Sequence, residues 1–277
     1  MTQKYPLISI IIPVYNHQDY ILETLESIYA DSYPNKELVL INDGSTDKCD
    51  DIIKEWIPSH KKDLKIIYKS RSNKGLSATM NELFSLSSGE FIVDIASDDF
   101  LLKDGIFKRY DYLKSNPDKL AVFGDCIVVD ENSKTISQSA LFEYRNFKRE
   151  DFDTSKGIKK AFITSFAMPG PVLMVKREIY DIIGGYDEGA IIEDLDFFLK
   201  MAAHNLIGFI DDKVSAYRIH GANMSSENSG KMLQILKDSR SIYLRNLNLF
   251  SPVEKAMILW QVFKLSLRIV IEQNKKF

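Results

Sequence analysis

The sequence has little of what several classes of protein require. It contains only two cysteines, Cys49 and Cys126, and neither lies in a CxxC motif or a Cys/His cluster. A disulfide framework and a zinc site are therefore not expected. The low cysteine content instead favours a reducing, cytoplasmic compartment. No segment reaches the ~18–20 uncharged apolar residues that a membrane-spanning helix needs. The first residues hold a short apolar run without a small-residue cleavage site, so we expect a core strand there rather than a signal peptide.

The sequence also lacks the common devices for binding anions. Its 36 Lys and Arg residues against 39 Asp and Glu residues give a formal net charge of −3, so no general basic surface for nucleic acid is expected. Neither the G-x-G-x-x-G dinucleotide fingerprint nor a Walker loop occurs. A diphosphate ligand would therefore need a cation and local hydrogen-bond donors in place of a glycine-rich cradle.

The pattern of apolar residues favours a large α/β domain. A chain of 277 residues is long enough for one such domain with a small appendage. Apolar, β-branched runs at 7–12, 36–43, 64–70 and 90–96 alternate with segments of helical periodicity. Strands buried on both faces and alternating with helices indicate a mostly parallel, doubly wound sheet.

Polar, turn-forming residues follow each of these predicted strands. They read PVYN at 13–16, NDGSTD at 42–47, RSNKG at 71–75 and SDD at 97–99. Ligands of such sheets bind beyond the carboxyl ends of the strands, so we expect these tips to converge on one site. Farther along, the patterns predict a hairpin over 119–136, a mobile loop over the site at 138–156, a helix over 193–205, and two short strands with a loop over 206–226.

The acidic pair Asp98 and Asp99 ends the fourth predicted strand. Carboxylate oxygens are hard ligands that suit Mg²⁺ or Mn²⁺, and such ions are commonly completed by substrate phosphates. A site with few protein ligands therefore suggests a bound nucleoside diphosphate. The alternative is that one acid caps the following helix, and both roles can coexist.

Taken together, the motifs resemble those of the GT-A glycosyltransferases of family 2. PVYN, NDGSTD, NKGLSATMN (73–81), SDD, GGYDE (184–188), ED (193–194) and YRIHGANMS (217–225) occur in the order and rough spacing of that family, over about residues 7–226. The resemblance implies an α/β GT-A catalytic domain over residues 1–228, with a nucleotide-sugar half at about 1–100 and an acceptor half at about 101–228. Residues 229–277 would form a C-terminal helical region.

The resemblance further implies an activity. The expected reaction is the inverting transfer of a sugar from a nucleotide-diphospho-sugar, with UDP expected as the nucleotide, to a glycan or lipid-linked glycan in surface polysaccharide or glycoconjugate synthesis. The expected cofactor is a divalent cation, Mn²⁺ or Mg²⁺. A non-catalytic glycan- or nucleotide-sugar-binding protein on a transferase fold is the alternative. A sugar-phosphate nucleotidyltransferase is disfavoured because its basic, glycine-rich N-terminal loop is absent.

Site residues follow from the resemblance, position by position. Asp194 is the expected catalytic base, with Glu193 beside it, although acids in a first helical turn also stabilise a helix through its dipole. Asp98 is expected to contact the ribose, and Arg218 to lie at the diphosphate. Asp99 and His220 are the expected metal ligands, with a hydrogen-bonded structural histidine as the alternative for His220. The remaining expected nucleoside contacts are Pro13, Tyr15, Asn16, Asp43, Asn73 and Gly75.

One position departs from the common pattern of the family. Many relatives carry an acid where this chain has Ala96. Asp94 shares a strand face with Ala96 but lies about 6–7 Å farther back at ~3.3 Å per residue, so it is not expected to replace the missing ligand. Metal binding is therefore expected to be weaker, or to depend more on His220 and the diphosphate.

The C-terminal segment 251–277 is expected to be a helix that is more apolar than a surface helix needs to be. Its polar residues form one narrow stripe, comprising Glu254, Gln261, Lys264, Arg268, Glu272 and Lys275. The apolar remainder could pack on the catalytic domain, form a homodimer, or lie in a membrane interface. In the last case the protein would be peripheral at the inner face of the membrane.

Overall fold

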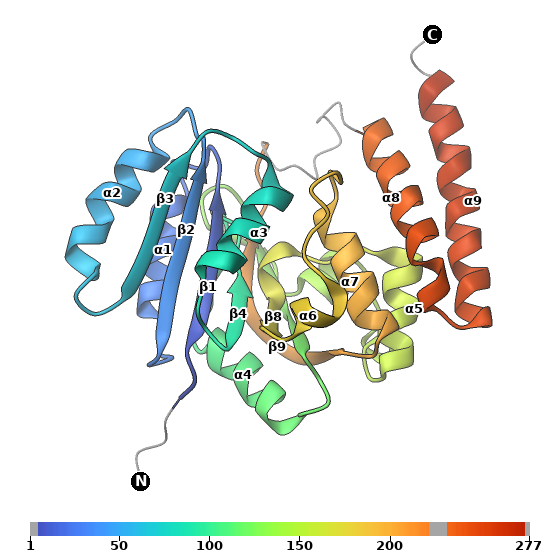
Figure 1. Cartoon of the computed structure of the whole chain (residues 1–277), viewed down its shortest axis with the longest axis horizontal. Coiled ribbons are helices and arrows are strands. Elements are labelled where there is room, and N and C mark those ends of the chain that lie inside the picture. The colour runs from blue at the N-terminus through green and yellow to red at the C-terminus, as the bar shows by residue number, and fades with distance from the viewer. Residues whose placement is uncertain (1–4, 222–231, 275–277) are drawn as a thin grey trace.

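The structure is a computed structural model that describes residues 5–221 and 232–274, with only the backbone at Glu193. Four strands form the parallel half of its sheet in the order β3-β2-β1-β4 (Figure 1). They are β1 (Ile8–Val14), β2 (Lys36–Asp43), β3 (Lys65–Arg71) and β4 (Phe91–Asp94). All four coincide with the predicted apolar runs, and their carboxyl ends lie at one edge.

The other half of the sheet is largely antiparallel. Its strands are β5 (Phe100–Leu101), β6 (Ala121–Val129), β7 (Thr135–Ser137), β8 (Leu173–Lys176) and β9 (Ile207–Arg218). β8 pairs antiparallel with β4 and with β6, β9 pairs parallel with β6 and antiparallel with β5, and β7 forms the predicted hairpin with β6. The predicted α/β class is confirmed. The sheet is mixed rather than mostly parallel, because hairpin and long-range pairings replace the βαβ crossovers that parallel strands need.

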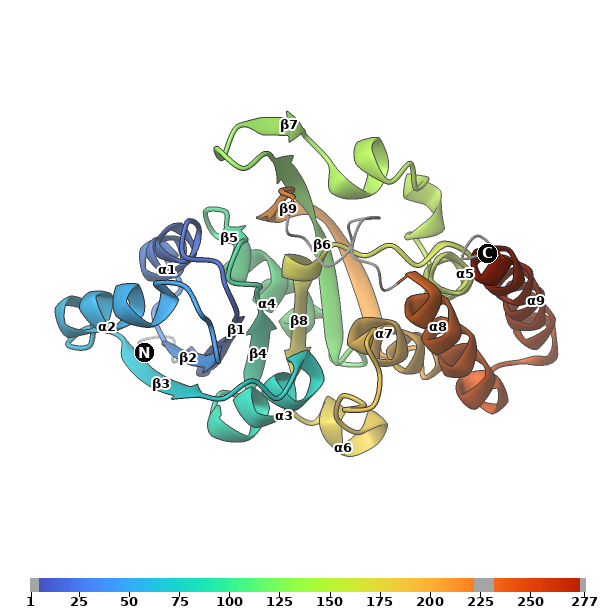
Figure 2. The ribbon, with the colours of Figure 1, turned by 90° about the horizontal axis from the view of Figure 1, so that it is seen from above.

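Helices cover both faces of this sheet. One face carries α1 (Ile21–Ala30), α2 (Cys49–His60) and α4 (Gly105–Ser115), and the other carries α3 (Leu76–Leu86), α5 (Ser155–Ser165), α6 (Ile179–Ile183) and α7 (Glu193–Ala203). Figure 2 shows α1 and α2 on the opposite side of β1 from α3. Helix α4 begins only at Gly105, so neither Asp98 nor Asp99 caps it.

Side-chain alternation along β1 divides the interior into two cores. Ile10 and Ile12 belong to the core that contains the apolar residues of α1 and α2, whereas Ile11 belongs to the core that contains Met80 and Leu83 of α3. Successive side chains of a strand point to opposite faces, so a strand covered on both faces needs an unbroken apolar run. This requirement explains why the first strands could be recognised from sequence.

Two predictions for the second half are wrong. Residues 138–156 contain short helical turns at Ala140–Tyr144 and Arg149–Asp151, and Leu141 and Phe152 are buried rather than in an open loop. Residues 207–218 form one continuous strand, β9, in place of two short ones. The centre of β9 carries exposed charged residues, which break the apolar pattern without breaking the strand. The part of that prediction that covers 222–226 lies outside the described residues.

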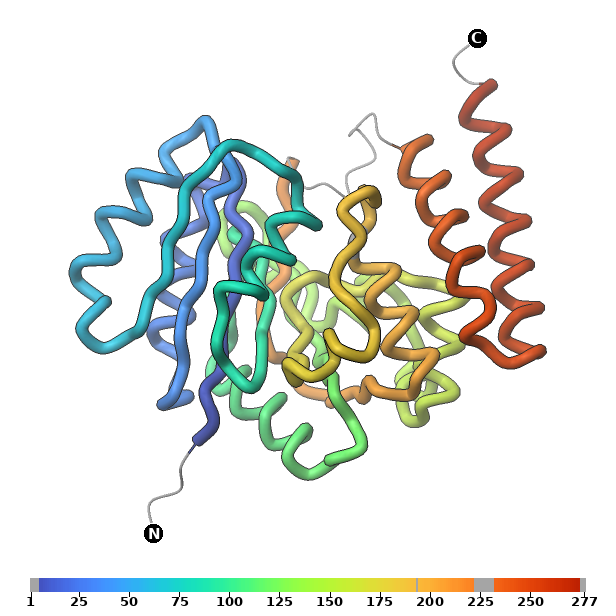
Figure 3. Tube along the Cα trace, in the orientation of Figure 1, coloured from blue at the N-terminus to red at the C-terminus, as the bar shows by residue number. Residues whose placement is uncertain are grey.

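Two helices follow at the C-terminal end, α8 (Met232–Asn246) and α9 (Pro252–Asn274). Helix α9 confirms the predicted helix and packs along α8 and α5. The tube in Figure 3 places α2 and α9 at opposite ends of the long axis of the molecule. The predicted boundary between residues 228 and 229 lies outside the described residues. None of the helices in the described ranges is long and apolar enough to cross a membrane.

Candidate functional site

The loops after β1 and β2 are tied together at the carboxyl edge of the sheet. The backbone N–H of Asn16 donates to Oγ of Ser45 (3.0 Å), and Oδ1 of Asn16 accepts from the backbone N–H of Thr46 (2.8 Å). Asn16 holds a left-handed backbone with φ 57°, which asparagine tolerates better than most residues. The neighbouring Tyr15 ring remains 48% exposed and Pro13 is half-buried. Hydrogen bonds therefore hold the two loops together, and the Tyr15 ring beside them is open to solvent.

Asp43, at the end of β2, binds the loop that follows β3. Its carboxylate is buried, pairs with Arg71, and accepts hydrogen bonds from the backbone N–H groups of Lys74 (2.8 Å) and Gly75 (3.0 Å). Gly75 has a φ of 89°, a conformation that side chains disfavour. Asn73 is exposed at the same turn, and its Oδ1 also accepts from Gly75 (3.1 Å). The structure thus brings together the predicted nucleoside contacts.

Three potential metal-ligating side chains meet beyond the end of β4. One ligand atom from each of His17, Asp98 and His220 lies within 4.8 Å of the others. Nε2 of His220 is 2.9 Å from Oδ2 of Asp98, and Nδ1 of His17 is 3.7 Å from Oδ1 of Asp98. Burial lowers the pKa of His17, so its imidazole is neutral at physiological pH, the form in which histidine binds metals. The cluster therefore offers two imidazoles and one carboxylate.

Asp99, which the sequence assigned to the metal, is not one of the three residues of this cluster. Its side chain is 2% exposed, and Oδ1 accepts a hydrogen bond from the backbone N–H of Arg218 (2.8 Å). Burial, reinforced by the neighbouring charge of Asp98, raises the pKa of Asp99 well above its ordinary value. Asp98 thus lies beside His220, and Asp99 accepts from the backbone at the end of β9.

Arg218, the residue predicted to lie at the diphosphate, is enclosed by protein groups at the end of β9. Its side chain is 1% exposed, its Nε donates to the carbonyl of Asp98 (2.7 Å), and its guanidinium pairs with Glu23 of α1. It also donates to Oγ of Ser133 in the β6–β7 hairpin (3.0 Å) and lies over the ring of Tyr20. Through these contacts, Arg218 holds the backbone of Asp98 to α1 and to the β6–β7 hairpin.

His17 was missed by the sequence reasoning. It directly follows the PVYN tip of the first strand, so extending that tip by one residue would have included it. Its Nδ1 lies 2.8 Å from Oγ of Ser97, and the two residues are separated by 80 positions in the chain. The parallel pairing of β1 with β4 brings the two loops that carry them together.

Asp194 lies in the first turn of α7, as predicted, and its Oδ1 accepts from the backbone N–H of Leu195 (2.7 Å). Burial raises its pKa to about 6. The charge of Asp194 in turn contributes to raising the pKa of Asp94, which places the start of α7 near the end of β4. Asp94 is not one of the residues of the histidine cluster. The side chain of Glu193 lies outside the described residues.

Two of the sequence motifs hold the segment that leads to Asp194. Asn81, the last residue of NKGLSATMN, donates from Nδ2 to the carbonyl of Tyr186 (3.0 Å) and accepts from its backbone N–H (2.9 Å). A side chain at Gly185 would collide with Asn81, since its Cβ would lie 2.7 Å from Oδ1. The GGYDE turn is therefore seated on α3, and this contact positions the start of α7.

The buried carboxyl of Asp194 has a cost in stability that pH can reveal. Because its pKa rises from an ordinary 3.8 to about 6 on folding, the folded chain binds this proton more tightly, and stability falls as pH rises from about 4 through about 6. Asp194→Asn should therefore stabilise the protein above pH 6 by about 3 kcal/mol. Urea unfolding at pH 7.5 and pH 4.5 measures this, and the gain should shrink at the lower pH. A variant less stable than the wild type at pH 7.5 would contradict the assignment.

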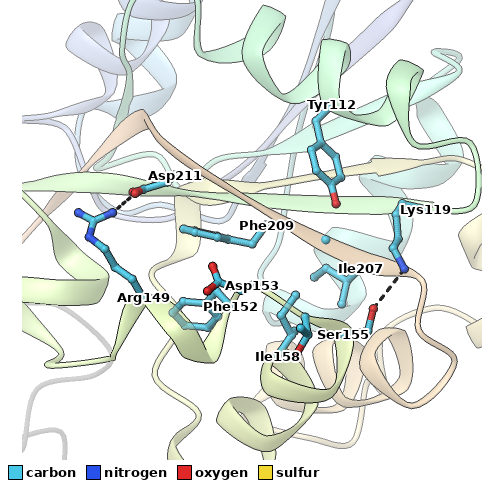
Figure 4. Close-up of a pocket in the computed structure, with 12 residues that line it drawn as sticks. Tyr112, Lys119, Arg149, Phe152, Asp153, Ser155, Ile158, Ile207, Phe209 and Asp211 are labelled. Carbon is cyan, nitrogen blue, oxygen red and sulfur yellow. Dashed lines mark hydrogen bonds and ion pairs between the residues drawn. The ribbon is translucent and has the colours of Figure 1, made fainter.

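A separate pocket of about 450 Å³ lies away from this site (Figure 4). It is lined by Phe152 and by Phe209 near the start of β9, with the Arg149–Asp211 ion pair at its edge. Phe209 is nine residues, roughly 30 Å of extended strand, from Arg218 at the other end of β9. The pocket therefore belongs to the opposite edge of the sheet from the histidine cluster.

The sequence of the chain matches known protein families and relatives. Residues 9–182 match the family model described as Glycosyl transferase family 2. Glycosyltransferase GlyA of Streptococcus pneumoniae serotype 4 is 26% identical over 273 residues, covering 94% of this chain and 38% of that protein. Poly-beta-1,6-N-acetyl-D-glucosamine synthase of Staphylococcus epidermidis is 28% identical over 203 residues, covering 72% of this chain and 46% of that protein. The chain thus spans less than half the length of these two relatives.

The fold matches solved structures. S. aureus TarS 1-349 in complex with UDP-GlcNAc superposes with a TM-score of 0.70 at 19% identity, covering 93% of this chain and 72% of that one. The mannosyltransferase PcManGT from Pyrobaculum calidifontis, in complex with GDP-Man and Mn²⁺, gives a TM-score of 0.64 at 18% identity, covering 95% and 74%. At this level of identity, the comparison bears on the fold alone.

Proposed function

The chain belongs to glycosyl transferase family 2, and from this membership and the geometry of the site we propose that it transfers a sugar from a UDP-sugar to a glycan acceptor. Its GT-A fold and its class, glycosyltransferase, are those the motifs predicted. Inversion at the anomeric carbon and a role in surface polysaccharide or glycoconjugate synthesis, on a free or lipid-linked glycan, belong to the proposal. UDP is supported by the UDP-GlcNAc named for TarS, whereas the GDP-Man of PcManGT supports the competing nucleotide.

The observation that carries the proposal is the cluster of His17, Asp98 and His220. Two imidazoles and one carboxylate fit Mn²⁺ better than Mg²⁺, which prefers oxygen ligands. We therefore assign metal binding to Asp98 and His220 with His17, and withdraw Asp99 from that role. A cation held there would supply positive charge to the departing diphosphate. We propose that His17 compensates for Ala96 by supplying a ligand where many relatives carry an acid.

The remaining groups act on the acceptor and the nucleoside. Asp194 accepts the proton of the acceptor hydroxyl as that oxygen attacks the anomeric carbon, and the bond from this carbon to the diphosphate oxygen breaks, releasing UDP. With a pKa of about 6, the carboxylate is ionised at neutral pH yet more basic than an ordinary aspartate. Glu193 is proposed to lie beside it. The proposed contacts of the nucleoside are Pro13, Tyr15, Asn16, Asp43, Asn73 and Gly75.

The non-catalytic alternative drew its support from Ala96 alone. A metal ligand from His17 would weaken that argument, and the match to glycosyl transferase family 2 supports an enzyme. The observations therefore favour transfer over binding without chemistry.

A thermal-shift screen of nucleotide-sugars tests the proposal. A ligand that binds only the folded chain adds about 2.7 kcal/mol at a hundred times its Kd, which corresponds to roughly 5–10 °C for a domain of this size. We expect this shift with a UDP-sugar and Mn²⁺, and a smaller one with Mg²⁺. A larger shift with a GDP-sugar would identify GDP, in place of UDP, as the nucleotide of the donor. The absence of any shift with any nucleotide-sugar would refute the donor site.

A further inference from the structure

Helix α9 exposes a large apolar face. Seven of its apolar side chains are about half exposed or more, with Trp260 at 59% and Phe263 at 51%. The seven are Val253, Leu259, Trp260, Phe263, Leu267, Val270 and Ile271. Several recur at intervals of three and four residues, so they lie on one side of the helix. Trp260 and Phe263 stack on each other with their ring centroids 5.4 Å apart.

The opposite side of α9 accounts for its packing within the chain. Ile258 and Ile269 are buried toward the core, and Gln261 donates from Nε2 to the carbonyl of Thr164 at the end of α5 (2.9 Å). Figures 1 and 2 show α9 as the outermost element, with α8 and α5 on its inner side. Intramolecular packing thus uses one side of the helix, and the exposed face points away from the domain. Contiguous apolar patches of this extent on a protein surface usually mark an interaction site.

The charges on α9 are divided between its two sides. One flank of the exposed face carries Lys264 and Arg268, both exposed. The other flank carries Lys255, which is half-buried. Glu254 instead points inward, where it pairs with Lys159 of α5 (3.5 Å). The apolar face is therefore bordered by cations, on a chain whose overall formal charge is −3.

We infer that this face docks on an anionic lipid surface. An interfacial helix buries tryptophan, phenylalanine and leucine at the headgroup boundary while its lysines and arginines meet the lipid phosphates. This arrangement matches both the apolar residues and the basic border of α9. Two copies of the chain packed through the same face about a two-fold axis would instead bring like charges together at the border, which disfavours a second copy as the occupant. The inference does not depend on the donor site.

Vesicle sedimentation with the full chain tests this docking. We expect binding to vesicles of three parts phosphatidylcholine to one part phosphatidylglycerol, and weaker binding to phosphatidylcholine alone. The double variant Trp260→Glu/Phe263→Glu should bind at least about ten-fold more weakly, because two large apolar side chains no longer enter the interface. Lys264→Gln/Arg268→Gln should lose roughly 30-fold on the anionic vesicles and much less on the neutral ones.

The matched control is Leu22→Glu/Ile182→Glu, which adds the same two charges at apolar positions that are similarly exposed on α1 and α6. It should bind as the wild type does, with all variants showing wild-type circular dichroism. Equal loss in this control, or no binding of the wild type to either vesicle, would overturn the inference. So would a dimer in sedimentation equilibrium that the Trp260→Glu/Phe263→Glu variant abolishes, since that result would identify a second copy as the occupant.

Discussion

Asp194→Asn is expected to lower the turnover number by about 10²–10⁴-fold, the usual contribution of a positioned general base. Asparagine keeps the shape of the side chain and can accept the same hydrogen bond from the backbone N–H of Leu195, but it cannot take a proton from the acceptor. Nucleotide affinity should remain within about two-fold, because the change affects the transition state alone. Steady-state kinetics and calorimetric titration with UDP and Mn²⁺ measure the two quantities.

Asp51→Asn is the matched control for this variant. Asp51 is an exposed acid in the first turn of α2, so the control removes the same type of charge from the start of another helix. Its turnover should equal that of the wild type. A near-normal rate for Asp194→Asn would remove Asp194 as the base. Together with its expected gain in stability, the loss of turnover would show that the chain tolerates a costly buried carboxylate for the sake of catalysis.

Asp98→Asn should abolish most of the Mn²⁺ dependence of UDP binding. Substituting groups that only support a metal ligand typically weakens metal affinity by 10–100-fold, so loss of a direct ligand should exceed about 100-fold. The effect arises because an amide offers no negative charge to the cation. Titration of UDP in the presence and absence of Mn²⁺ measures the dependence directly.

Asp99→Asn separates the assignment made from sequence from the one made from structure. Its Oδ1 would still accept from the backbone N–H of Arg218, as Asp99 does, so the cluster of Asp98 with the histidines should persist. We expect the Mn²⁺ dependence to survive in this variant. If Asp99→Asn instead loses it and Asp98→Asn keeps it, the original assignment of the metal to Asp99 is restored.

The contrast between these two acids shows how far the sequence could be interpreted. The acidic pair was correctly placed at the carboxyl edge, because the apolar run of β4 predicts where the strand ends. Adjacent side chains leaving a strand point in different directions, and the sequence does not say which direction faces the ligand. The contacts of these two acids come from Arg218 at the end of β9 and His220 just after it, more than a hundred residues later.

Burial of α9 was likewise beyond the reach of the pattern. The segment was recognisable as a helix with one narrow polar stripe, but what its apolar remainder packs against was left open. In the structure, one residue of that stripe, Gln261, is buried against α5, while Trp260 and Phe263 are exposed. Burying an amide that has a backbone hydrogen-bond partner costs little free energy. Polarity alone therefore did not identify the side of the helix that packs on the domain. For strand β2, by contrast, the pattern was sufficient, because the predicted run at 36–43 coincides with the strand from Lys36 to Asp43.

The contact between Arg218 and Glu23 has a consequence for how the protein is made. The two residues are 195 positions apart, and the same arginine holds the backbone of Asp98 and the hairpin at Ser133. Closing so long a loop costs entropy that local contacts do not recover. The first strands can pair as they leave the ribosome, but His220 and Arg218 emerge much later. The histidine cluster is therefore assembled late, and a nascent chain that stops before β9 carries the loops after β1, β2 and β3 without it.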